Sequence, residues 1–137
     1  MCIFTWLLKT NYLRVRILED LFEFFSFRPI GAKKLIKQWQ KTKGRLETEL
    51  ESEYKLAVIE ADSALDEILK KMGYPGDTIG EKLEKINVAV LPSVEEVREA
   101  HKIRNNIVHD PDYRINLDGV KKVITIYEKA LTDLGAL

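Results

Sequence analysis

The chain has 137 residues, 45% hydrophobic and 32% charged, with a formal net charge of zero. This length supports one ordinary domain with a real hydrophobic core, and the composition argues against a disordered chain. The single cysteine, Cys2, excludes an internal disulfide, and no His or Asp cluster lies near it in the sequence. The cysteine usage therefore fits a reducing, cytoplasmic compartment, with no catalytic role for Cys2.

The neutral total conceals two segments of opposite charge. Residues 28–46 hold seven Lys and Arg and no acidic residue, whereas residues 47–137 hold 12 Lys and Arg against 19 Asp and Glu, a net charge of −7. This asymmetry indicates an acidic folded body with a basic arm. The arm contacts either an external anionic partner or the body itself.

Residues 1–28 form a Phe-rich apolar segment that contains all five phenylalanines of the chain. Charged residues interrupt it too often for a spanning helix, which needs roughly 20 nearly uncharged apolar residues. No small-residue cleavage site follows an apolar core, which argues against a signal peptide. Two alternatives stay open: an extra helix that packs on the body, or an interfacial anchor through which residues 1–46 contact a membrane peripherally.

Residues 29–51, the basic arm, are predicted to contain a helix from Ala32 to Leu50. Apolar side chains recur there at helical spacing with lysines between them. The run Arg28-Pro29-Ile30-Gly31 is expected to separate this helix from the Phe-rich segment, and Gly44 weakens the helix without necessarily ending it. The lysines indicate a solvated face or, alternatively, contacts with phosphate or lipid.

Residues 52–137, the body, are predicted to form four helices. The first carries an apolar face from Tyr54 to Met72 and stops at Gly73. Thr78 and Glu81 have capping-box spacing and open a short second helix.

The third and fourth helices follow Pro92. Ser93 and Glu96 repeat the capping-box spacing and open a helix that ends at about His109, because Pro111 disfavours helical geometry at the residue before it. The last helix buries a face from Val120 to Leu134. No segment shows strand alternation, so the sequence predicts an all-α, antiparallel four-helix bundle with an extra basic N-terminal helical segment.

Arg104 is the unusual residue of the third helix. At 100° per residue it falls in the middle of the apolar arc, between Val97 and Ala100. A guanidinium keeps its charge, so it needs a carboxylate when it is buried. Asp62, at the margin of the first helix's apolar face, is the predicted partner, with Asp66 as the alternative.

His101 lies on the same apolar arc of the third helix. It is expected to be a buried histidine bonded to a neighbour rather than a metal ligand.

The run Arg104-Asn105-Asn106-Ile107-Val108-His109, near the end of the third helix, resembles the Arg-x4–6-His motif of HEPN domains. In that family a polar residue, often Asn, follows the Arg, and Asn105 matches it. The similarity covers about residues 52–137 and extends to uncharacterised small bacterial proteins of this kind. It includes the stretches 54–62, 100–105 and 126–131.

The resemblance implies a mechanism. Many HEPN domains are metal-independent endoribonucleases in which two protomers bring their motifs to one cleft. Carried over, His109 acts as general acid or base, Arg104 holds the scissile phosphate and Asn105 orients the RNA backbone. The sequence shows no Cys/His or clustered-carboxylate spacing, which agrees with a site without metal or cofactor. The implied partners are a second copy, RNA and, in a toxin, a cognate antitoxin.

Three observations favour a structural role for the same motif. The body is acidic, whereas RNA binding depends on neutralising phosphates. His109 falls about 140° from Arg104 on an ideal helix. An ion pair with Asp62 explains Arg104 without catalysis, and the favourable interaction of a histidine with the last carbonyls of a helix explains His109. Two functions therefore stay open: an RNA-cleaving HEPN protein of toxin or phage-defence type, and a non-catalytic HEPN-like dimerisation or scaffold module, held at a membrane by the Phe-rich start.

Overall fold

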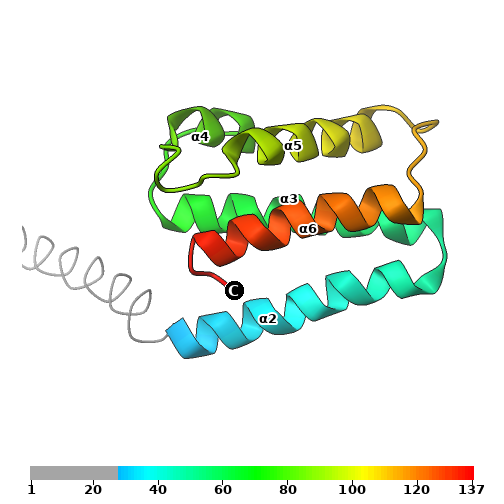
Figure 1. Cartoon of the computed structure of the whole chain (residues 1–137), viewed down its shortest axis with the longest axis horizontal. Helices are drawn as coiled ribbons and strands as arrows, with labels where there is room; N and C mark the ends of the chain where they lie inside the picture. Colours follow the sequence, from blue (N-terminus) through cyan, green and yellow to red (C-terminus); the bar gives the residue numbers. More distant parts are fainter. Residues whose placement is uncertain (1–27) are drawn as a thin grey trace, which may run out of the picture. The chain divides into compact units, whose positions relative to one another are not determined.

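The structure is a computed structural model that describes residues 28–137, so the predicted membrane contact of the Phe-rich segment falls largely outside the described residues. Every regular element in the described part of the chain is helical, which confirms the all-α prediction. Residues 35–137 form one compact unit. The elements are α2 (Arg28–Gly44), the 3-10 helix η1 (Arg45–Thr48), α3 (Glu51–Lys71), α4 (Ile79–Lys85), α5 (Val94–His109) and α6 (Leu117–Asp133). Figure 1 labels the five α-helices.

Helices α3 and α6 share the largest contact of the bundle, and α5 packs against both. Along α3, the side chains of Ala57, Val58, Ala61, Leu65 and Leu69 are fully buried, at the three- and four-residue spacing of one helical face. Burial of this apolar face against α5 and α6 supplies the main drive for folding. The helix ends before Gly73, whose φ of 87° is the left-handed conformation that glycine adopts without strain.

The N-termini of α4 and α5 differ, although their sequences carry the same signature. Before α4, Thr78 Oγ1 accepts a hydrogen bond from the Glu81 backbone N–H at 3.2 Å, so the predicted cap forms. Before α5, the Ser93 hydroxyl caps nothing and is buried without a hydrogen-bond partner. The predicted capping box of Ser93 and Glu96 is therefore wrong. Ser93 is buried at the turn from Leu91, and its backbone carbonyl accepts from Val97 N instead.

The basic arm contacts the body. Trp39 joins the hydrophobic core, Arg45 Nε lies 2.6 Å from Glu60 Oε1, and Lys43 Nζ lies 3.3 Å from Glu128 Oε1. The alternative in which the arm meets the body is thus observed for these residues.

The predicted limits of the arm's helix are wrong at both ends. Helix α2 already includes Arg28 to Gly31, which were expected to separate it from the preceding segment, and it ends at Gly44, where the chain tightens into η1. Leu50, expected on the helix's apolar face, is exposed. None of the helices among residues 28–137 combines the length and apolar character required to cross a membrane.

Candidate functional site

Asp62 is the centre of a polar network that joins three helices. Its side chain, on α3, is only 5% exposed. Oδ1 accepts a hydrogen bond from the Tyr127 hydroxyl of α6 at 2.7 Å and lies 2.8 Å from His101 Nδ1 of α5. Oδ2 lies 3.6 Å from Arg104 Nε, also on α5. One carboxylate therefore contacts three side chains from two other helices.

This arrangement offsets the cost of burying the Asp62 carboxylate. A buried carboxylate is costly unless a cation and hydrogen-bond donors surround it, and here it has both. Burial and the negative charge of Asp62 both raise the pKa of Tyr127 above the ordinary tyrosine value. Tyr127 therefore keeps its proton and donates a hydrogen bond to the carboxylate.

Arg104 forms the predicted ion pair with Asp62. At 3.6 Å the contact is a charge pair rather than a hydrogen bond, and the buried Nε atom has no hydrogen-bond partner. Nη1 donates to Asn105 Oδ1 at 3.1 Å, and the side chain is 29% exposed. Asp62 thus holds the inner edge of the guanidinium while part of the side chain reaches the surface.

His101 is held between Asp62 and Asn105. Because Asp62 can only accept, the ring nitrogen facing it, Nδ1, carries the proton in the neutral imidazole. Nε2 is then an acceptor, and Asn105 Nδ2 lies 3.4 Å from it. Gly80 of α4 lies next to Nε2, because a methyl group added at Gly80 would be 3.9 Å from this nitrogen. The expectation of a histidine bonded to a neighbour is confirmed, and 15% of the side chain stays exposed.

The other two predicted site residues lie outside this network. His109 is the last residue of α5 and is exposed, and no hydrogen bond or ion pair between described residues joins it to Asp62, Arg104 or Asn105. Asp66, the alternative partner of Arg104, instead lies 2.5 Å from the buried amine of Lys82. The structure therefore brings together Arg104, Asn105 and Asp62, and separates His109 and Asp66 from them.

Tyr127 is a member of the network that was not predicted from the sequence. Tyr127 lies on the buried face of α6. Because a buried hydroxyl needs a hydrogen-bond partner, its position on this face could have indicated a polar contact. Val108 lies near Val97 on a wheel of 100° per residue but is 46% exposed, so the buried arc of α5 is narrower than the wheel predicts.

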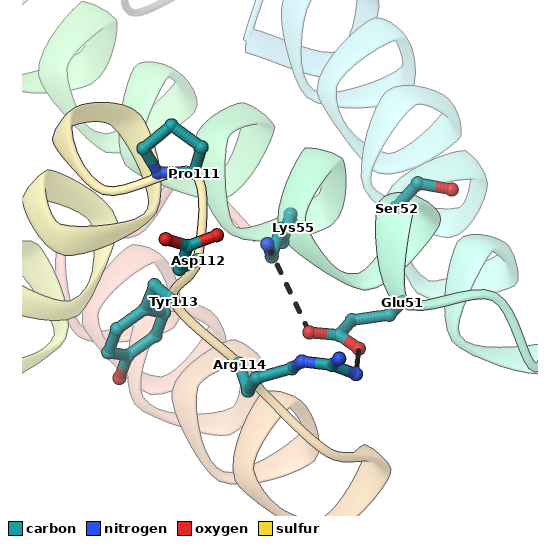
Figure 2. Close-up of a pocket in the computed structure, with 7 residues that line it drawn as sticks. All are labelled: Glu51, Ser52, Lys55, Pro111, Asp112, Tyr113 and Arg114. Atoms are coloured by element: carbon teal, nitrogen blue, oxygen red, sulfur yellow. Dashed lines mark hydrogen bonds and ion pairs between the residues drawn. The ribbon is translucent and has the colours of Figure 1, made fainter.

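A hollow beside the end of α5 is the second candidate. It lies between the start of α3 and the connection from α5 to α6, and Figure 2 shows Glu51 between Lys55 and Arg114. Glu51 Oε2 lies 3.5 Å from Arg114 Nη1, and Oε1 accepts from the Ile115 backbone N–H at 3.3 Å. Glu51 thus offsets the charge of the cations around it and ties the connection to α3. This role is structural, and the Asp62 network is the stronger candidate for chemistry.

Among the described residues, no three His, Cys, Asp or Glu side chains converge closely enough to hold a metal ion. Comparisons of the chain with family models, curated proteins and solved structures gave no match.

Proposed function

We propose that the chain is a HEPN-like protein that cleaves RNA as a homodimer, with Arg104 binding the scissile phosphate. One observation carries the proposal: Asp62 holds Arg104 by its inner edge while 29% of the side chain remains at the surface. In this proposal, helices α3 to α6 are the antiparallel four-helix bundle of the HEPN fold, and two copies pair through it. In a toxin, a cognate antitoxin would cover the same surface.

The anchored guanidinium is suited to phosphate. A planar group with several N–H donors fits phosphate oxygens, and anchoring Nε lowers the entropy lost when the outer nitrogens bind. Asn105 accepts from Nη1 and holds the group from a second side. Donors fixed in advance stabilise the charge that develops on the phosphorane more than mobile ones do.

Because the body is acidic, the attraction of RNA must come from exposed basic side chains elsewhere in the chain. Lys37 and Lys41 of α2 are exposed one helical turn apart, whereas Lys43 and Arg45 are engaged by acidic residues. Exposed lysines at this spacing can follow successive phosphates. We therefore expect RNA binding to weaken steeply with salt.

The test is RNA cleavage in EDTA by wild-type, Arg104→Ala and Lys102→Ala proteins, with folding checked by circular dichroism. Lys102→Ala is the matched control because it removes one positive charge from the exposed face of the same helix. We expect Arg104→Ala to lose at least about 100-fold in rate, the size of effect typical for removing a group that stabilises transition-state charge, and Lys102→Ala to stay within about threefold. No cleavage by folded wild-type protein, or equal rates in the two variants, would refute the proposal.

A second candidate is a non-catalytic dimerisation or scaffold module. It is favoured by the internal satisfaction of the network: both Asp62 oxygens have partners, and Tyr127 and His101 bond to the same atom. In that case Arg104 and His101 orient α5 on α3, and the Arg104→Ala variant loses stability without any RNA-cleaving activity to lose. A folded wild type that dimerises but leaves RNA intact is the result expected for this alternative.

A further inference from the structure

We infer that His101, rather than His109, is the proton-transferring residue of the site, with Asp62 and Tyr127 as its positioning residues. The inference rests on the proposed RNA cleavage and names a catalytic residue that the Arg-x4–6-His pattern does not contain.

His101 has the geometry of a general base. Its Nδ1 lies 2.8 Å from the buried carboxylate of Asp62, which orients the ring and leaves Nε2 as the nitrogen that can take a proton. Tyr127, bonded to the same carboxylate oxygen at 2.7 Å, holds Asp62 in place from the opposite helix. A base, its carboxylate partner and a fixing hydroxyl thus come from α5, α3 and α6.

Nε2 and the phosphate-binding donors adjoin one another. Asn105 contacts both groups, because its Oδ1 accepts from Arg104 Nη1 at 3.1 Å and its Nδ2 lies 3.4 Å from His101 Nε2. At 3.4 Å the second contact is weak, so a stronger donor can replace it at Nε2. A Cβ at Gly80 would be in van der Waals contact with Nε2, so glycine leaves that position unfilled, and 15% of the His101 side chain is exposed. A ribose hydroxyl next to a phosphate on Arg104 would therefore lie within reach of Nε2.

The step balances without a co-reactant. Nε2 takes the proton of the 2′-hydroxyl as the 2′ oxygen attacks phosphorus, so the P–O2′ bond forms and the P–O5′ bond breaks. The 5′ oxygen leaves and takes a proton from solvent, and the imidazolium returns its own proton to solvent. The products are a 2′,3′-cyclic phosphate and a free 5′-hydroxyl, while Arg104 offsets the charge on the phosphorane.

His109 lacks these supports. It is exposed at the last position of α5, and none of the hydrogen bonds that orient His101 reaches it. A histidine there is favourable for the helix end whether or not RNA is present.

The test compares cleavage of one RNA by wild type, His101→Asn, His109→Asn and Arg104→Ala proteins. Asn at position 101 can still donate to Asp62 but cannot take a proton, so the network is kept and the base is lost. We expect His101→Asn to lose about 100-fold or more in kcat with a small change in KM, and His109→Asn to keep wild-type kcat within about threefold.

Chemical rescue separates catalysis from packing. In the His101→Ala protein, added imidazole should restore the rate at least tenfold, which a purely structural histidine would not allow. Cleavage that is lost in Arg104→Ala but kept in His101→Asn would overturn this inference alone. Absence of cleavage by the wild type would overturn both the inference and the proposed function.

Discussion

At Asp62, three side chains share one carboxylate, and each contributes in a different way. Tyr127 donates a short hydrogen bond of 2.7 Å, His101 lies 2.8 Å from the same oxygen, and Arg104 supplies charge at 3.6 Å. A hydrogen bond to a carboxylate is stronger than one between neutral groups. Because the Tyr127 side chain is neutral, replacing it by Phe removes this hydrogen bond without changing the charge of the network.

We predict that Tyr127→Phe lowers the free energy of unfolding by about 1.5–3 kcal/mol, because a buried carboxylate loses a donor. The effect should depend on pH. Since burial and Asp62 raise the pKa of Tyr127 in the folded state, its proton is held more tightly there than in the unfolded chain. The wild type's advantage should therefore be constant well below pH about 10 and shrink at higher pH, where only the unfolded tyrosine ionises.

Urea unfolding of both proteins between pH 6 and 11 measures this difference. A constant advantage across the whole range would show that the Tyr127 pKa is the same in the two states.

At the scale of the elements, the N-termini of α4 and α5 provide a matched pair. Thr78 caps α4 with its hydroxyl, whereas the Ser93 hydroxyl before α5 is buried without a hydrogen-bond partner. We predict that Thr78→Ala costs about 1 kcal/mol, as loss of a helix cap usually does. Ser93→Ala should be neutral or stabilising, because it removes a buried polar group that has no partner. Chemical denaturation of the two variants checks this order, and a greater loss in Ser93→Ala would show that the hydroxyl has a partner in solution.

The attachment of α2 to the body is a second element-scale feature. Trp39 is 5% exposed within the core, whereas Ile36, three residues earlier, is 41% exposed. We predict that Trp39→Ala lowers the unfolding free energy by about 3 kcal/mol and Ile36→Ala by less than about 1 kcal/mol, measured in urea on the full chain. Equal small losses would mean that α2 does not pack on the body.

Helix faces and helix ends could be predicted from the sequence where local chemistry decides them. The face from Tyr54 to Leu69 and the stop at Gly73 follow from periodicity and from the freedom of glycine at positive φ. The absence of a cap at Ser93 could not be predicted, because its hydroxyl is placed by the packing of the preceding turn and not by the spacing to Glu96.

The network could be predicted only in part. Arg104 needed a carboxylate, and Asp62 was the acid at the margin of the facing helix. That His101 and Tyr127 share this acid depends on how α5 and α6 rotate about α3, which one helical wheel does not show. The exposure of His109 could not be predicted for the same reason. A helical wheel gives the angle of a residue within α5 but not which other elements surround the end of the helix.

At the scale of the whole molecule, the charge asymmetry has two parts. Lys43 and Arg45 contact acidic side chains of the body, so part of the arm's charge is used in folding. Lys37 and Lys41 stay exposed and available to an anion. Under the proposed function, these two lysines of the arm would attract RNA to a chain whose body is acidic.

The most direct measurement is cleavage of a short RNA and of the same strand with 2′-deoxyribose at every position, by the wild-type chain in EDTA. If Arg104 holds the phosphate while the 2′-hydroxyl attacks it, the RNA is cut to products with 2′,3′-cyclic phosphate ends and the deoxy strand stays intact. Cleavage of both strands at similar rates, or of neither, would contradict the account.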